Sequence, residues 1–219
     1  MVEIYCDGAD LSKLEEYAED ERIKGFTTNP SLMKKAGIKD YKTFAKTVLS
    51  LVKGKPVSFE VLSDDWKEME RQAREIQSWG DNVYVKIPIT NTKGESSKGL
   101  IEKIADLNLN ITAIMTWEQT RHIELVTRSN HILSVFNGRI MDTLRHPIIF
   151  RGSACLRSRT LWASTRELFN IYQAEFLGYD IITLTPDLIE KFPLQGKDLT
   201  QYSRETVQQF HKDGEGLTI

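Results

Sequence analysis

A lysine inside a short β-branched run is the residue with the clearest chemical potential in this sequence. The run Val83–Pro88 (VYVKIP) alternates like a β-strand, with its valines and isoleucine on one face, Lys86 on the other and a proline at its end. If both faces of the sheet are covered, the Lys86 amine enters a low-dielectric space that disfavours its charged form. A neutral amine is a nucleophile toward a carbonyl carbon. The alternative interpretation is a lysine that packs its stem on the strand while its amine reaches water.

Polar side chains also stand at the ends of the other predicted strands. Each one alone has an ordinary explanation, such as a helix cap, an interior packing layer or a solvated helix residue. Their occurrence on seven successive strands favours a shared site, because a barrel gathers its functional groups at the carboxyl ends of its strands. These residues are Asp7, Thr27, Thr28, Asn29, Glu60, Lys86, Asn110, Thr112, Ser134, Arg139, Ser164, Thr165 and Arg166.

The chemistry that fits this set of side chains proceeds through an imine. Lys86 can form a carbinolamine and then a Schiff base with a ketone, and the iminium accepts electrons when a neighbouring carbon–carbon bond breaks. Asp7 is a candidate base for the hydroxyl of the departing fragment, and Glu60 is a candidate proton shuttle for imine formation. Arg139 and Arg166 carry planar guanidinium groups that are suited to binding a phosphate.

The elements that must position these residues alternate regularly along the chain. Short apolar runs that are typical of strands are each followed by apolar residues at helical spacing. Eight such units predict a (β/α)8 TIM barrel in a single domain over residues 1–219, with its seventh strand over 161–164 and the following helix over 167–177. One more helix, over about residues 199–212, lies outside the repeat. An open doubly wound sheet is the alternative fold, but no glycine-rich dinucleotide turn follows the first strand.

Composition argues against several classes of function. The 219 residues carry a net charge of -2, and 40% are hydrophobic and 27% charged, which favours neither nucleic-acid binding nor a basic membrane patch. No apolar stretch approaches the ~20 residues that span a bilayer. Acidic residues near the start argue against a secretory signal, and Cys6 and Cys155 lack the spacing of a metal or redox site. We therefore expect a cytoplasmic protein with reduced thiols and no nucleic-acid or membrane partner.

Four motifs resemble those of a known enzyme family. They are Gly25–Leu32 (GFTTNPSL), Val85–Pro88 (VKIP), Ser134–Ile140 (SVFNGRI) and Ala163–Arg166 (ASTR). They resemble the motifs of transaldolases, and the short chain is similar to the small-subunit transaldolases and the related fructose-6-phosphate aldolases. The resemblance runs from the first to the eighth strand. It implies a class I aldolase on a (β/α)8 barrel with no metal or organic cofactor.

The resemblance also implies a role for each matching residue. Lys86 would form the Schiff base, Asp7 would act on the C4 hydroxyl, and Glu60 would shuttle protons through a water held by Thr112. Asn29, Asn110 and Ser134 would hold hydroxyls of the dihydroxyacetone unit, and Arg139, Arg166 and Ser164 would hold phosphate. The substrate-binding set is then Thr28, Asn29, Asn110, Ser134, Phe136, Arg139, Ser164 and Arg166.

Two positions distinguish a transferase from a lyase. The aldolase branch of the family tends to have Gln where this chain has Glu60, and Tyr where it has Phe136. Because Phe136 cannot donate a proton to the enamine, we expect a transaldolase that moves a dihydroxyacetone unit from a ketose phosphate of the fructose 6-phosphate or sedoheptulose 7-phosphate type to an aldose phosphate. The alternatives are a lyase that releases free dihydroxyacetone and a catalytically silent barrel that binds a sugar phosphate.

Three segments bear on substrates and assembly. The loop over residues 90–98 is longer than in short family members and is expected at the mouth of the site, while residues 145–159 follow no pattern that we can place. The helix over 199–212 carries apolar residues on a polar background. The resemblance implies a homo-oligomer, a pentamer or a decamer; the alternative is a helix that closes the barrel floor of its own subunit.

Overall fold

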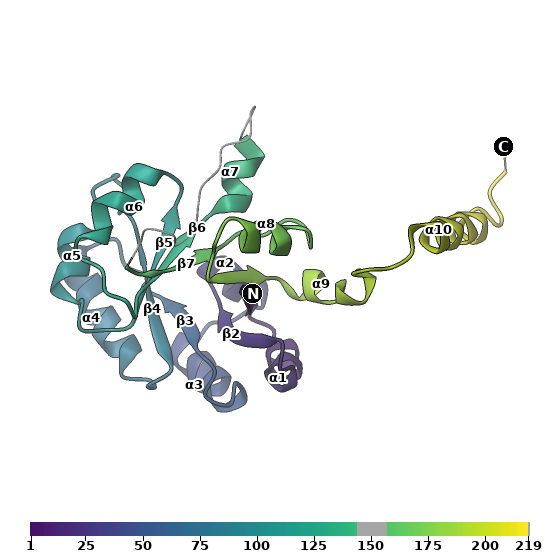
Figure 1. The fold of residues 1–219 in the computed structure, drawn as a ribbon. Helices are drawn as coiled ribbons and strands as arrows, with labels where there is room; N and C mark the ends of the chain where they lie inside the picture. Colours follow the sequence, from purple (N-terminus) through teal and green to yellow (C-terminus); the bar gives the residue numbers. More distant parts are fainter. Residues whose placement is uncertain (144–156, 219) are drawn as a thin grey trace.

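A computed structural model describes residues 1–143 and 157–218 of the chain, and a closed parallel barrel is its central feature (Figure 1). The strands are β1 (Glu3–Asp7), β2 (Ile23–Thr27), β3 (Val57–Glu60), β4 (Val83–Pro88), β5 (Leu109–Ile114), β6 (Ile132–Val135), β7 (Arg159–Trp162) and β8 (Ile181–Leu184). Each strand pairs in parallel with the next along the chain, and β8 closes on β1. The predicted (β/α)8 TIM barrel is therefore confirmed, and the open doubly wound sheet is excluded.

Helices connect the strands and cover the outside of the barrel (Figure 1). They are α1 (Leu11–Glu19), α2 (Pro30–Lys35), α3 (Tyr41–Leu51), α4 (Trp66–Gln77), α5 (Lys98–Lys103), α6 (Trp117–Glu124), α7 (Asn137–Thr143), α8 (Asn170–Phe176), α9 (Pro186–Ile189) and α10 (Leu199–Asp213), with a 3₁₀ turn at Phe192–Leu194. Most start at polar caps; Thr116, for example, forms a capping box with Gln119 at the start of α6.

The alternation within β4 separates two apolar layers. Val83, Val85 and Ile87 are fully buried in the larger cluster between the barrel and its helices, whereas Tyr84 packs with the cluster inside the barrel. Tyr5 fills part of that interior, and a Cβ at Gly25 would lie 2.5 Å from its ring, so only glycine fits there. Packed side chains thus fill the barrel interior beside the polar end of β4.

The register of the strands sets the polar residues beside one another. Glu60 of β3 is level with Lys86 of β4, which is level with Asn110 of β5. On the other side of the barrel, Asp7 of β1 is level with Thr27 of β2. The carboxyl ends of the five adjacent strands β1 to β5 therefore bring two carboxylates, one amine and one amide to one end of the barrel.

The strand and the helix that follow α7 have other bounds than the sequence predicts, because of the local backbone conformation and local hydrogen bonds. β7 ends at Trp162 and not at Ser164, because Ser164 takes a left-handed conformation with φ of 61°. α8 begins at Asn170 and not at Glu167, because the Asn170 side chain accepts hydrogen bonds from the Arg166 and Glu167 amides and closes a turn there. Most of the segment 145–159, including Cys155, lies outside the described residues.

The C-terminal helix α10 extends away from the barrel, as Figure 1 shows. None of its 15 residues is buried, and Leu199, Val207 and Phe210 expose large apolar side chains. Within residues 1–143 and 157–218, no helix is long and apolar enough to cross a membrane.

Candidate active site

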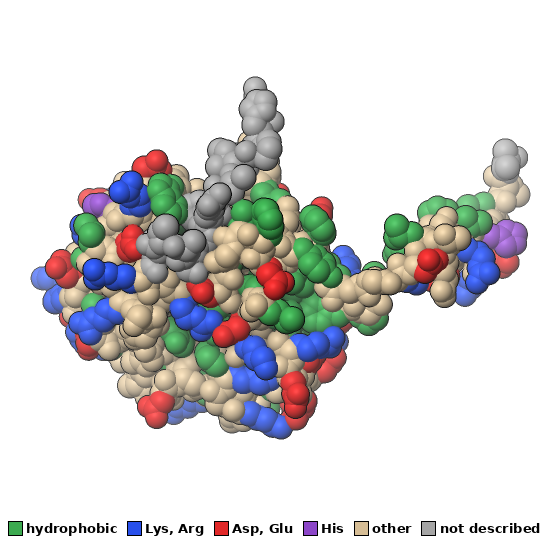
Figure 2. Space-filling model, viewed as in Figure 1, with side chains coloured by type: hydrophobic (Ala, Val, Ile, Leu, Met, Phe, Trp, Pro, Cys, Tyr) green, Lys and Arg blue, Asp and Glu red, His purple; other side chains and the backbone are tan. Residues whose placement is uncertain are grey.

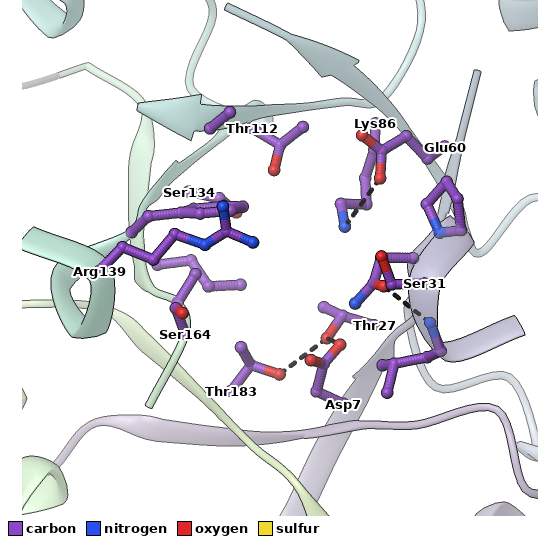
Figure 3. A pocket seen from close by; sticks show the side chains of 17 residues that line it. Asp7, Thr27, Ser31, Glu60, Lys86, Thr112, Ser134, Arg139, Ser164 and Thr183 are labelled. Atoms are coloured by element: carbon purple, nitrogen blue, oxygen red, sulfur yellow. Dashed lines mark hydrogen bonds and ion pairs between the residues drawn. The ribbon is translucent and has the colours of Figure 1, made fainter. Parts of the chain in front are cut away.

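A polar cavity of about 400 Å³ opens at the carboxyl ends of the strands (Figure 3). Its side chains come from β1 through β8 and from the loops that follow them. The lining residues include nine of the predicted site residues: Asp7, Asn29, Glu60, Lys86, Thr112, Ser134, Phe136, Arg139 and Ser164. Of the other predicted residues, Thr28 and Asn110 are buried without lining the cavity, and Arg166 does not line it either.

Lys86 is buried, and its amine contacts two other polar groups of the protein. Its side chain is 8% exposed, its Nζ lies 3.4 Å from Glu60 Oε2, and it donates a hydrogen bond to the Thr28 carbonyl at 2.9 Å. The interpretation of a lysine that reaches out to water is therefore wrong. The amine has a carboxylate within reach that can take its proton.

Asp7 lies across the cavity from this pair, at the end of a chain of hydroxyls (Figure 3). Thr27 Oγ1 donates to Asp7 Oδ1 at 2.7 Å and lies 2.7 Å from Thr183 Oγ1. Burial raises the pKa of Asp7, although the positive charge of Lys86 and the Thr27 hydrogen bond act in the opposite direction. A carboxylate that holds a proton more tightly than usual is suited to act as a base toward a substrate hydroxyl.

The wall between Lys86 and Arg139 consists of amide and hydroxyl groups. Ser134 Oγ donates to Asn110 Oδ1 at 2.6 Å, and Asn110 Nδ2 donates to Ser58 Oγ at 3.0 Å. These two bonds set the direction in which the Ser134 oxygen faces the cavity. The buried Thr112 hydroxyl has no hydrogen-bond partner within the described part of the chain, so it can bind a group that enters the cavity.

Arg139 forms the opposite side of the cavity, next to Ser164. Its guanidinium lies 5.5 Å from the centre of the Phe136 ring, and the flat group presents its edge to the cavity (Figure 3). Gly138 allows this approach, because a Cβ there would lie 1.5 Å from the Ser164 carbonyl oxygen. The start of α7 and the segment that follows β7 therefore touch, and they bring a cation and a hydroxyl to one place.

Arg166 is the predicted residue that the structure does not bring into the cavity. Its Nε and Nη2 both contact Asp142 Oδ2, at 3.2 and 2.6 Å, and the two side chains are 48% and 52% exposed. An ion pair this exposed contributes little stability, so a competing anion can replace Asp142 at low cost.

Two polar residues of the cavity, Ser31 and Thr183, were not among the predicted strand-end residues, and Thr27 was among them without a role of its own. Thr183 interrupts the apolar run of β8 on its inward face, and that interruption is the signal that predicts it. The loop over 90–98 does not line the cavity; it folds back through a Thr90–Ser96 bridge, and Asp64 accepts hydrogen bonds from the Thr92 amide and hydroxyl at 2.7 and 2.6 Å.

Comparison with solved structures supports the fold. The chain is similar to a dihydrodipicolinate synthase from Rhodopseudomonas palustris, with a TM-score of 0.53, 15% identity and coverage of 84% of this chain and 70% of the other. It is also similar to a sialic acid aldolase from Ruminococcus gnavus, with a TM-score of 0.52, 12% identity and coverage of 82% and 66%. At such identities the likeness concerns the fold alone. The chain is therefore a (β/α)8 barrel with a cavity at the carboxyl ends of its strands.

Sequence comparison gives the family. The chain belongs to the family described as Transaldolase/Fructose-6-phosphate aldolase, which it matches over residues 4–218. A probable transaldolase of Nitrosopumilus maritimus is 29% identical over 199 residues, covering 87% of this chain and 86% of the relative. A probable transaldolase of Thermoplasma volcanium is 28% identical over 214 residues, covering 92% and 93%. The resemblance of the four motifs is therefore confirmed at the level of the family.

Proposed function

We propose that the chain is a transaldolase that moves a dihydroxyacetone unit from a ketose phosphate to an aldose phosphate through a Schiff base on Lys86. The observation that carries the proposal is that Lys86, Glu60 and Asp7 line one cavity of a barrel of this family. An amine, a proton shuttle 3.4 Å from it and a separate base are the groups that imine-mediated cleavage requires.

The proposed reaction begins at the Lys86–Glu60 pair. Glu60 takes a proton from Lys86 Nζ, and the free amine attacks the C2 carbonyl to give a carbinolamine. Glu60 returns the proton to the departing hydroxyl, through a water at the Thr112 hydroxyl, and an iminium remains. Asp7 then removes the proton of the C4 hydroxyl as the C3–C4 bond breaks. An aldose phosphate leaves, and the electron pair stays on Lys86 as an enamine.

The second half of the proposed reaction is the reverse of the first half, with a different aldehyde as the acceptor. The enamine carbon attacks the acceptor carbonyl, Asp7 returns its proton to the new C4 hydroxyl, and water releases the ketose phosphate from Lys86. Asn29 and Ser134 are proposed to hold the dihydroxyacetone hydroxyls. Arg139 and Ser164 would hold the phosphate, and Arg166 would join them by exchanging Asp142 for the phosphate oxygens.

The test of this function is a product assay with fructose 6-phosphate. With erythrose 4-phosphate as acceptor, we expect sedoheptulose 7-phosphate and glyceraldehyde 3-phosphate to form in equal amounts. Without an acceptor, we expect little free dihydroxyacetone, because the enamine keeps its three carbons on the enzyme. Fast release of dihydroxyacetone without an acceptor would replace the transferase proposal with the lyase. No turnover together with binding of the sugar phosphate would support a silent barrel.

Phe136 offers a substitution that tests the same distinction. Phe136→Tyr places a hydroxyl near the enamine, and we expect release of free dihydroxyacetone to rise about tenfold or more, since a positioned acid contributes at least 10²-fold in favourable cases. Enzymatic measurement of dihydroxyacetone from fructose 6-phosphate alone checks this. Phe136→Leu, which removes the ring but adds no donor, is the matched control; equal release by both variants would contradict proton delivery by the new hydroxyl.

We also propose that the chain forms a homo-oligomer, a pentamer or decamer, through α10. Figure 2 shows hydrophobic side chains along this extended segment, and Leu199, Val207 and Phe210 are 79%, 63% and 70% exposed. Phe210→Glu should shift the mass measured by light scattering toward the monomer, because it sets a charge in the buried contact. Gln208→Glu adds the same charge on the same helix and should leave the mass unchanged. A monomeric parent chain would contradict the proposal.

A further inference from the structure

The hydrogen-bond ladder between β2 and β3 stops one bond early beside the Lys86–Glu60 pair. The Thr28 amide still donates to the Ser58 carbonyl, at 3.3 Å. In a parallel ladder the next bond would run from the Glu60 amide to the Thr28 carbonyl. In this chain that carbonyl accepts from Lys86 Nζ, at 2.9 Å, and the Glu60 amide has another partner.

The other partner is the phenol of Tyr41, the first residue of α3. The Glu60 amide donates to Tyr41 Oη at 2.7 Å, and Tyr41 Oη donates to the Glu60 carbonyl at 3.0 Å. One hydroxyl therefore satisfies both backbone groups of Glu60. It also leaves the Thr28 carbonyl free of the ladder and able to bind the Lys86 amine.

The Tyr41 ring is fixed by its neighbours, so the hydroxyl has a defined position. It packs edge-on against Phe59 and Trp79, with ring centres 6.1 and 5.5 Å away. Burial raises the pKa of the phenol, which therefore keeps the proton that it donates. This packing alone would account for an aromatic ring at the position, but it gives no reason for the hydroxyl.

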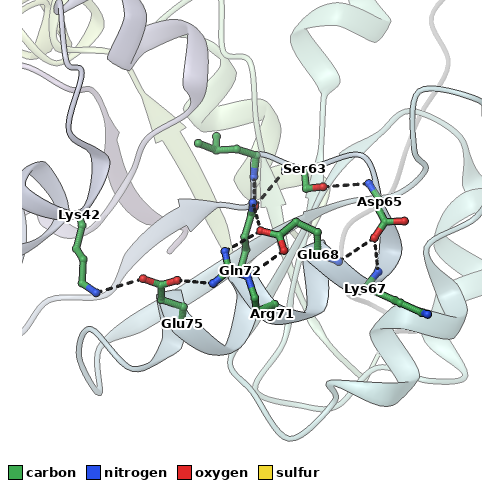
Figure 4. A network of polar contacts seen from close by, with 9 residues as sticks. Lys42, Ser63, Asp65, Lys67, Glu68, Arg71, Gln72 and Glu75 are labelled. Atoms are coloured by element: carbon green, nitrogen blue, oxygen red, sulfur yellow. Dashed lines mark hydrogen bonds and ion pairs between the residues drawn. The ribbon is translucent and has the colours of Figure 1, made fainter.

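The segment that follows Glu60 is held from the other side by α4 (Figure 4). Gln72 Oε1 accepts hydrogen bonds from the Leu62 and Ser63 amides at 2.7 and 3.1 Å. Gln72 Nε2 in turn donates to Glu68 at 3.1 Å. The backbone around Glu60 thus has polar anchors on both α3 and α4, and Tyr41 is the anchor that contacts Glu60 itself.

We propose that Tyr41 is a positioning residue for the imine chemistry. By taking the Glu60 amide out of the strand ladder, its hydroxyl sets the Glu60 carboxylate beside Lys86 and frees the Thr28 carbonyl to orient the Lys86 amine. This inference rests on the proposed function, and it adds a residue outside the cavity whose role is to act through Glu60 and Lys86.

Tyr41→Phe tests the proposal because it keeps the packed ring and removes only the hydroxyl. The measurement is the rate at which borohydride traps the Lys86 adduct at saturating fructose 6-phosphate. Mass analysis of the Lys86 peptide identifies the adduct, and the experiment is run well below the temperature at which the protein unfolds. We expect the rate to fall roughly 10- to 100-fold, as for small misplacements of reacting groups, with little change in KM. Tyr17→Phe is the control, because it removes another partly buried tyrosine hydroxyl, which donates to the Pro186 carbonyl and does not line the cavity, and it should trap at close to the parent rate.

A double-mutant cycle separates positioning from a general loss of stability. If Tyr41 acts through the Glu60 carboxylate, Tyr41→Phe should cause little further loss in a Glu60→Gln background. We expect the pH dependence of trapping to flatten in both Tyr41→Phe and Glu60→Gln, since both substitutions uncouple the Glu60 carboxylate from the Lys86 amine.

Two results would overturn the inference. One is trapping by Tyr41→Phe at the parent rate, and the other is an equal fold-loss in the parent and Glu60→Gln backgrounds, which would mark a purely structural role. A parent protein that yields no Lys86 adduct would overturn the proposed function, and this inference with it. A failure of the proposed function can be told apart from a failure of the Tyr41 inference, because it is seen in the parent protein before any substitution is made.

Discussion

Replacing Lys86 with methionine is expected to abolish transfer, with a loss on the order of 10⁴-fold or more, as when other enzymes lose a covalent nucleophile. Methionine keeps the length and apolar stem of lysine and cannot form an imine. Borohydride treatment with fructose 6-phosphate should then leave the protein mass unchanged. The variant should also be less stable than the parent, because Glu60, whose side chain is 17% exposed, loses the partner of its charge.

A second lysine provides the matched control for this experiment. Lys55 is also partly enclosed, and its Nζ donates to the Ala18 and Asp20 carbonyls at 2.7 and 3.0 Å, outside the cavity. Lys55→Met should lower stability and leave trapping at Lys86 intact. An adduct that persists in Lys86→Met would place the imine on another lysine and would refute the proposed chemistry.

The fold and much of the site were predictable because they depend on local periodicity and on the geometry of parallel strands. Lys86 and Glu60 stand at the ends of adjacent strands, and in a barrel such ends converge whatever the connecting helices contain. Asp7, at the end of the first strand, joins them because β8 closes on β1 and completes the ring. No knowledge of side-chain torsions is needed for that prediction.

The side-chain partners were not predictable in the same way. Arg166 stands where a phosphate-binding arginine was expected, but its direction depends on Asp142, 24 residues earlier in the chain, and on torsions that no spacing encodes. Tyr41 has the sequence signature of a helix residue with an apolar ring. Its contact with Glu60 depends on how α3 lies against the end of β3, which only the packed structure defines.

The two carboxylates of the cavity are suited to different tasks because their surroundings differ. Glu60 lies 3.4 Å from an amine with which it can exchange a proton directly. Burial raises the pKa of Asp7, and its hydrogen bond comes from the neutral hydroxyl of Thr27. Separate environments for two acids permit one to serve imine formation and the other to serve bond cleavage. Substitution of Asp7 should therefore stop the reaction after the imine has formed.

Asp7→Asn is expected to lower transfer about 10²- to 10⁴-fold, the usual contribution of a general base, while Lys86 still reacts with the ketose. The asparagine Oδ1 can still accept the Thr27 hydrogen bond, so the geometry of the chain of hydroxyls is kept. Trapping with borohydride should then yield mainly the uncleaved six-carbon phosphate on the Lys86 peptide. A three-carbon adduct, or transfer near the parent rate, would show that another group removes the C4 proton.

The same substitution should change the pH dependence of stability, with a sign that follows from burial. Because burial raises the pKa of Asp7 in the folded state, that state binds the proton more tightly than the unfolded chain does. The Asp7 contribution to the free energy of unfolding is therefore most favourable at low pH and is lost as pH rises from the unfolded pKa through the folded one. Asparagine does not titrate, so Asp7→Asn should gain stability relative to the parent over that window. Urea unfolding at a series of pH values measures the difference, and a difference that shrinks as pH rises would contradict a raised pKa. The activity of the parent should fall as the pH is lowered, because acid protonates the Asp7 carboxylate that the cleavage step requires as a base.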